Sequence, residues 1–153
     1  MIKFYFFLLA IFLSTVVHAQ SDSFTRFENI TVHHSVFSST SVLPKIASQL
    51  GIVRGKNYVL INIAITDNDS TTGGKPASVS GIAMNLMQQV KKLEFKEINE
   101  ATATYYIASL RVTEKEIFHF TINVTPKTIG VDSKPNNNKP YEIKFTKKLY
   151  VNE

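Results

Sequence analysis

Alternation of apolar and polar residues with a period of two is the feature that most constrains the fold. In the clearest run, 59–66, valine or isoleucine stands at every second position, and the residues between them are leucine, asparagine, alanine and threonine. Side chains of a β-strand point alternately to opposite faces, so this pattern predicts a strand with one buried face. Six further runs alternate in the same way: 30–37, 77–86, 93–99, 102–112, 117–125 and 141–149.

One short helix is predicted at Pro44–Leu50, because proline suits a first helical turn and Gly51 suits the left-handed position after the last one. Turn signals separate the strands at intervals of about ten residues, and the longest loop runs from Lys127 to Pro140. The chain is therefore predicted to be mainly β: an antiparallel, seven-stranded sandwich of the immunoglobulin or fibronectin type. A partly open β-barrel is the alternative.

The N-terminus has the pattern of a cleavable export signal. Lys3 precedes an apolar run from Phe4 to Leu13, and Val17-His18-Ala19 supplies small residues where signal peptidase cuts. The run is shorter than the roughly 20 apolar residues that a spanning helix needs. We expect cleavage after Ala19, which leaves 20–153 as a single domain outside the cytoplasm with no transmembrane segment.

Cysteine is absent, which excludes disulfides, cysteine–zinc sites, thiol nucleophiles and a lipidated N-terminus. Only Lys3 among the 17 lysines and arginines lies in the signal, so cleavage lowers the net charge from +5 to +4. The lysines are scattered and not interleaved with aromatic residues, so no nucleic-acid partner is predicted.

The segment Gly51–Asn57 is the first candidate binding site. It places Arg54, Lys56 and Asn57 on a short loop, where the arginine fork could hold a carboxylate or a phosphate. The alternative is that Arg54 pairs internally with Glu94 or Glu97 and fastens the loop to the sheet.

Asn85 has apolar neighbours that suggest burial, so its amide must find hydrogen bonds, either to a ligand or to the backbone of a closed loop.

His33 and His34 are adjacent in a strand and point to opposite faces, so they cannot ligate one metal together. No metal site and no cofactor is predicted. Asp67 and Asp69 open like a calcium loop, but the glycine and glutamate that such a loop requires are missing.

No catalytic constellation is present. The chain lacks a Gly-x-Ser-x-Gly elbow, and the strand carboxylates Glu94, Glu97 and Glu142 have no local partner that would separate their pKa values into an acid and a base. We therefore expect no enzymatic activity.

Short motifs in a fixed order resemble a family of small exported bacterial proteins, domain of unknown function 4426. They are Val32-His33, Ser39-Thr40, Pro44-x-Ile46-Ala47, Gly51-Ile52-x-Arg54-x-Lys56-Asn57, Asn62-Ile63, Val79-Ser80-Gly81-x-Ala83-x-Asn85-Leu86, Leu93-Glu94-Phe95-x-Glu97-Ile98, Tyr105-Tyr106-Ile107-Ala108 and Phe145-x-x-x-Leu149-Tyr150. The resemblance implies a periplasmic protein of a Gram-negative cell and no particular activity. His34 stands where the family pattern has an aromatic residue, Gly55 where it has serine, and Lys127–Pro140 is longer than the pattern.

Three functions follow as hypotheses. The first is a non-enzymatic binding module for another protein or an envelope component, which uses the Arg54 loop and an adjoining sheet edge. The second is a small-molecule or metal-binding protein with His33, His119, Tyr105 or Asn85 in a pocket between the sheets. The third is a hydrolase or isomerase that uses Glu94 or Glu97.

Overall fold

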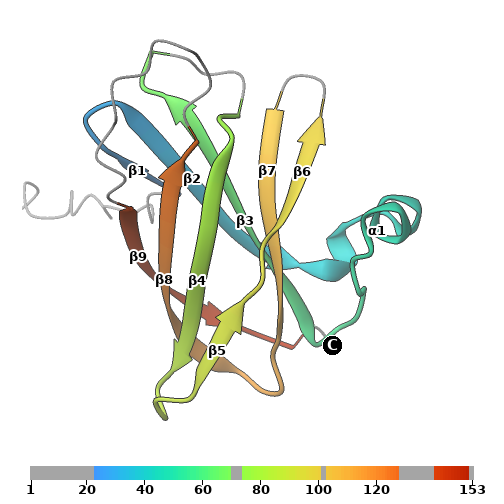
Figure 1. Ribbon diagram of the computed structural model, residues 1–153. Helices are drawn as coiled ribbons and strands as arrows, with labels where there is room; N and C mark the ends of the chain where they lie inside the picture. Colours follow the sequence, from blue (N-terminus) through green and yellow to red (C-terminus); the bar gives the residue numbers. More distant parts are fainter. Residues whose placement is uncertain (1–22, 70–73, 101–102, 128–139, 152–153) are drawn as a thin grey trace, which may run out of the picture.

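Two antiparallel β-sheets pack face to face in the computed structural model, which describes residues 23–69, 74–100, 103–127 and 140–151 (Figure 1). The predicted signal peptide at 1–19 and nearly all of the loop Lys127–Pro140 lie outside the described residues. One sheet has the order β1 (Phe24–Arg26), β2 (Ile30–Ser38), β3 (Tyr58–Asp67), β7 (Ala103–Arg111) and β6 (Lys96–Glu100). The other has the order β5 (Val90–Leu93), β4 (Ala77–Asn85), β8 (Glu116–Pro126) and β9 (Tyr141–Leu149).

The core lies between the two sheets, as the alternation predicts. Ile61, Ile63 and Ile65 of β3 are fully buried, and Phe118 and Ile122 of β8 belong to the same cluster from the opposite sheet. Burial of these large side chains is the main favourable term for a chain without cysteine. The prediction of a mainly β chain with two antiparallel sheets and one helix is confirmed, and the described strands form no closed barrel.

The predicted number of strands is too low, because the described residues form nine. The run 93–99 was expected to be one strand, but β5 ends at Leu93 in one sheet and β6 begins at Lys96 in the other. Glu94 and Phe95 carry the chain across the edge between the sheets. Leu93 and Phe95 keep the period of two, and only Ile98 lies out of phase with them, which is too short a signal to reveal the change of sheet. β1 was missed because three residues are too few to show an alternation.

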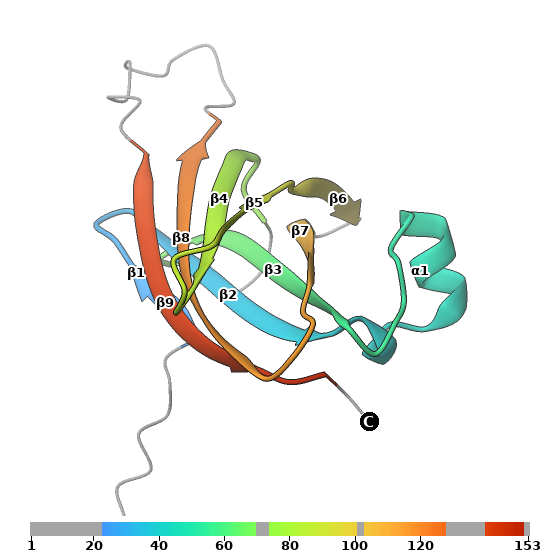
Figure 2. The same ribbon diagram turned by 90° about the horizontal axis from the view of Figure 1, so that it is seen from below.

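The helix α1 (Pro44–Leu50) forms as predicted, with proline in its first turn and Gly51 in the left-handed conformation at φ 63°. The Gly51 N–H donates to the carbonyls of Ala47 and Ser48, which closes the last turn. A short 3-10 helix, Ser39–Ser41, precedes it. Seen from below, α1 stands on the side of the β1–β2–β3–β7–β6 sheet that faces away from the second sheet (Figure 2).

Candidate functional site

The loop 51–57 is fastened to the chain that precedes α1. The buried Ser39 hydroxyl accepts a hydrogen bond from the Gly55 N–H at 3.0 Å and donates to the Gly55 carbonyl at 3.1 Å. The Arg54 guanidinium donates to the Thr40 carbonyl at 3.0 Å. Arg54 thus binds a backbone oxygen, and the expected pairing with Glu94 or Glu97 is wrong. Lys56 is exposed, and the Asn57 carbonyl accepts from the Val112 N–H at 2.9 Å.

A groove of about 380 Å³ lies between this loop and the outer face of the sheet. We call it the α1 groove. One wall is the end of α1 with the start of the loop, the other runs from Lys92 at the end of β5 through the crossing to β6, and β7 forms the floor. Its lining residues are Leu50, Gly51, Ile52, Val53, Lys92, Glu94, Lys96, Ile98, Ile107 and Ser109.

Lys96 joins the two walls. Its ammonium donates to the Leu50 carbonyl at 3.0 Å, and this carbonyl is one that the end of α1 leaves without a partner inside the helix. A lysine at a helix C-terminus also meets the negative end of the helix dipole. Gly51 leaves room for this contact, because a Cβ at that position would lie 2.9 Å from Lys96 Nζ. This bond between β6 and α1 therefore fixes the two walls of the groove relative to each other.

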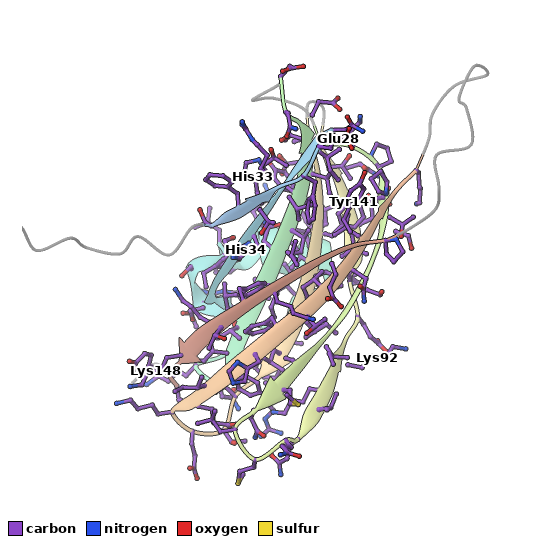
Figure 3. The ribbon with its side chains drawn as sticks, turned by 90° about the vertical axis from the view of Figure 1, so that its left-hand side faces the viewer. Glu28, His33, His34, Lys92, Tyr141 and Lys148 are labelled. Carbon is purple, nitrogen blue, oxygen red and sulfur yellow. The ribbon has the colours of Figure 1, made fainter. Side chains whose placement is uncertain are left out.

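The rim of the α1 groove carries more positive than negative charge. Lys92 of β5 and Lys96 of β6 line it together with Glu94 of the crossing, and all three lie on the same wall. Val53, on the loop wall opposite, exposes 55% of its surface. Figure 3 labels Lys92 at the edge of the molecule. A groove with apolar side chains on one wall and lysines on the other suits a ligand that carries an apolar group next to a carboxylate.

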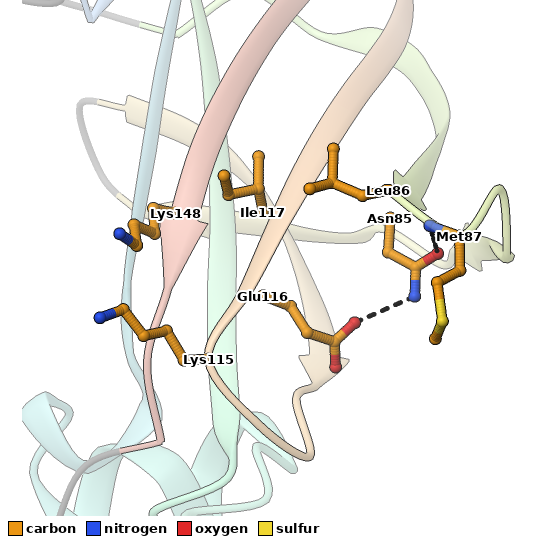
Figure 4. A pocket seen from close by; sticks show the side chains of 7 residues that line it. All are labelled: Asn85, Leu86, Met87, Lys115, Glu116, Ile117 and Lys148. Carbon is orange, nitrogen blue, oxygen red and sulfur yellow. Dashed lines mark hydrogen bonds between the residues drawn. The ribbon is translucent and has the colours of Figure 1, made fainter.

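Asn85 lies in a different place, at the end of β4. Its amide nitrogen donates to Gln89 Oε1 at 2.8 Å and to Glu116 Oε2 at 3.0 Å, and its oxygen accepts from the backbone N–H groups of Met87 and Gln89. The side chain thereby closes the β4–β5 hairpin and joins it to β8 (Figure 4). The bond from Asn85 lowers the pKa of Glu116 below its usual value.

Asn85 also borders a second hollow, of about 300 Å³, which we call the hairpin pocket (Figure 4). Its lining residues are Asn85, Leu86, Met87, Lys115, Glu116, Ile117 and Lys148.

The three described histidines do not form a shared site. His33 is exposed and its Nε2 lies 3.1 Å from Thr66 Oγ1, whereas His34 is half-buried and stacks on Phe145 with ring centres 4.1 Å apart (Figure 3). His119 is exposed on β8, where its Nδ1 lies 2.8 Å from Thr146 Oγ1. Within the described ranges, no three histidine, aspartate or glutamate side chains are grouped so that they could hold a metal ion.

Tyr105 is half-buried on the outer face of its sheet, and Ala64 of β3 separates it from His33. Neither residue faces the space between the sheets. The neighbouring Tyr106 does: its hydroxyl accepts from the Ala77 N–H at 2.6 Å and donates to Glu97 Oε2 at 3.3 Å. Bonds from Asn99, Lys127 and Tyr106 lower the pKa of Glu97, which is the opposite of what a general acid near neutral pH requires.

The structure thus separates the predicted residues into three places: the loop with Arg54, Lys56 and Asn57; the hairpin with Asn85; and the outer sheet face with His33 and Tyr105. Sequence reasoning missed Lys92 and Lys96 of the α1 groove and Lys115 and Lys148 of the hairpin pocket. Scattered lysines give no local signal, and only the fold brings them beside loops distant in sequence.

The architecture and the open hollows define a small two-sheet β protein with surface grooves. The family model described as Domain of unknown function (DUF4426) matches residues 24–152. The chain belongs to this family, as the resemblance of its motifs implied. A search among curated proteins gives no match.

Solved structures agree with this assignment. A DUF4426 family protein from Pseudomonas aeruginosa is 29% identical with a TM-score of 0.70, and the match covers 85% of this chain and 95% of that one. FetP of uropathogenic Escherichia coli, recombinantly expressed in the periplasm, is 12% identical with a TM-score of 0.61, over 83% and 92% of the two chains. A copper-bound variant of FetP is 14% identical with a TM-score of 0.62, over 85% and 95%. At such low identity, the likeness to FetP extends to the fold alone.

In the part of this chain that the structure describes, no helix is long and apolar enough to cross a membrane.

Proposed function

We propose that this chain is an exported, non-catalytic binding protein of the periplasm, and that it holds a segment of another envelope protein in the α1 groove. The observation that carries the proposal is the groove itself, in which Lys92 and Lys96 line one wall while the apolar Ile52 and Val53 line the other. The segment that fits carries an apolar side chain next to a carboxylate. Export by cleavage after Ala19 belongs to the same proposal, and the signal pattern at the start of the sequence supports it.

The edge position of β6 favours a peptide over a free small molecule. β6 is the last strand of its sheet, so one side of its backbone has no neighbouring strand in the described fold. An extended segment that pairs with a strand edge gains main-chain hydrogen bonds, and its alternate side chains enter neighbouring pockets. The α1 groove lies against this strand through Lys96 and Ile98.

We infer that the two sheets form a sandwich of the immunoglobulin type. The order β2–β3–β7–β6 facing β5–β4–β8–β9 corresponds to strands A, B, E, D facing C′, C, F, G of that architecture. Such sandwiches commonly place recognition on their loops and edges, where the α1 groove lies.

Copper binding is not carried over from FetP to this chain. The copper-bound variant shares the fold at 14% identity, and the described histidines of this chain lie on separate faces. None of the hollows brings a metal-ligand set together among the described residues.

The test is a crosslinking pull-down from intact cells that compares the wild type with Val53→Glu and Lys92→Glu. Both residues line the groove and neither takes part in the core, so the variants should fold. Lys144→Glu, on the exposed face of β9, is the matched control for the change of charge. We expect a captured partner to be retained by the control and lost by both groove variants. A partner that is captured equally by all four proteins would refute the assignment of the site.

A further inference from the structure

A second surface lies at the end of the sheets where the β4–β5 hairpin, the β7–β8 loop and the last described residues meet. Leu86 and Met87 at the hairpin expose 66% and 73% of their surfaces, and Tyr150 exposes 52%. Leu86 and Met87 border the hairpin pocket opposite Lys115 and Lys148 (Figure 4). Large apolar side chains that gather in solvent mark a contact surface, because isolated globular proteins rarely expose them together.

Lysines flank this apolar group. Lys115 and Lys148 line the hairpin pocket, and their ammonium nitrogens lie 5.2 Å and 5.8 Å from the centre of the Tyr150 ring. The aromatic face thus holds two cations beside exposed apolar groups. Lys147, next along β9, lies on the other face of the strand and lines a separate hollow beside His34.

Two carboxylates are also present in this region. Glu114 is exposed in the β7–β8 loop, while Glu116 receives hydrogen bonds from Asn85 and Thr113. Lys91 of β5 also acts on Glu116, so Lys91, Lys115 and Lys148 together leave the local charge positive against these two carboxylates.

We infer that this end of the protein docks on an anionic lipid surface. A bilayer interface accepts the combination of groups found here: apolar side chains enter the boundary of the acyl chains, tyrosine sits at headgroup level, and lysines reach the anionic headgroups. Lysine suits this position because its aliphatic stem can lie on apolar surface while the ammonium stays among the headgroups. The inference does not rest on the proposed function, since the α1 groove is lined by different residues.

The binding is expected to be reversible and dependent on salt. Each lysine near an anionic membrane contributes about fivefold to affinity, so removal of two lowers it by roughly 30-fold. Removal of two exposed apolar side chains is expected to cost at least about tenfold. Screening at high salt weakens the contribution of the lysines and leaves that of Leu86 and Met87.

The test is sedimentation of the purified protein with vesicles of phosphatidylglycerol and phosphatidylethanolamine, and in parallel with vesicles of phosphatidylcholine. The protein is taken from the soluble extract of expressing cells, and mass spectrometry verifies that every variant has the same N-terminus. The variants are Lys115→Gln with Lys148→Gln, and Leu86→Ser with Met87→Ser. Lys45→Gln with Lys144→Gln is the control, because it removes the same charge from α1 and the exposed face of β9.

We expect the wild type and the control to bind the anionic vesicles and not the neutral ones, and both test variants to lose that binding. Equal binding to both kinds of vesicle, no binding at all, or an equal loss in the control would overturn the inference. So would a wild-type dimer that the Leu86 and Met87 changes dissociate in light scattering, because the surface would then be covered by a second copy.

Discussion

Replacement of Asn85 by alanine should destabilise the whole domain, although the residue lies at a hairpin. Its amide makes four hydrogen bonds, two donated and two accepted, and it is only 4% exposed. Alanine removes all four bonds. The turn of the hairpin then loses its side-chain contacts to Met87 and Gln89, and β4 loses its bond to Glu116 of β8.

The magnitude follows from these four bonds. A neutral hydrogen bond contributes about 1 kcal/mol net, and one to a charged group such as Glu116 contributes about 1.5–3 kcal/mol. The N–H groups of Met87 and Gln89 lie at an exposed hairpin. In the variant they can donate to water in place of the lost Asn85 oxygen, which reduces the total loss of stability. We expect a loss of about 2–3 kcal/mol, which lowers the melting temperature by roughly 10 °C for a domain of this size.

Urea and thermal denaturation followed by circular dichroism measure this loss. Asn29→Ala is the matched control, because Asn29 is exposed and its change should stay within about 0.5 kcal/mol. A double-mutant cycle with Glu116→Gln should give a coupling energy of about 1 kcal/mol between the two side chains. If Asn85→Ala costs less than about 1 kcal/mol, the hairpin does not depend on the amide and the reasoning is refuted.

Three further predictions concern other parts of the chain. Burial, with the charges of His33 and Lys147, lowers the pKa of His34 below its ordinary value of 6.5. The contribution of neutral His34 to stability should therefore be complete above pH 6.5 and decline as the pH falls through the lowered pKa. His34→Tyr should flatten this decline in urea midpoints measured between pH 7 and 5, and an unchanged profile would contradict the prediction. Gly81→Ala should cost about 1–3 kcal/mol in urea denaturation, because a Cβ there would lie 2.8 Å from the Thr121 carbonyl oxygen, and a neutral result would show that β4 and β8 can separate locally. Mass spectrometry of the exported protein should find Gln20 as its first residue, whereas retention of residues 1–19 would refute the predicted signal.

Much of the fold could be predicted because it depends on local patterns. The alternation at 59–66 placed β3, and Pro44 with Gly51 bounded α1. The division of 93–99 between two sheets could not be predicted, because the backbone changes partners at Glu94 and Phe95 and the only sign of it is one apolar residue, Ile98, that lies out of phase with Leu93.

The candidate site was predictable in part. The loop with Arg54 stood out for its residue types. The hydrogen-bond partner of Arg54 is the Thr40 carbonyl, and because every residue has a carbonyl oxygen, the sequence gives no sign of which one is bound. Lys96 was invisible for a related reason, since its role depends on the last turn of α1 lying beside β6. Both contacts join segments that only the folded chain brings together.

Site-specific photo-crosslinking in living cells tests the proposed binding function most directly. A photoreactive phenylalanine analogue would replace Val53, Lys92 or Lys144 in three separate variants of the full chain. The proposal predicts the same covalent adduct from Val53 and Lys92, and mass spectrometry should place its crosslink on an apolar and acidic segment of one envelope protein. No adduct at either groove position, or the same adduct at Lys144, would contradict it.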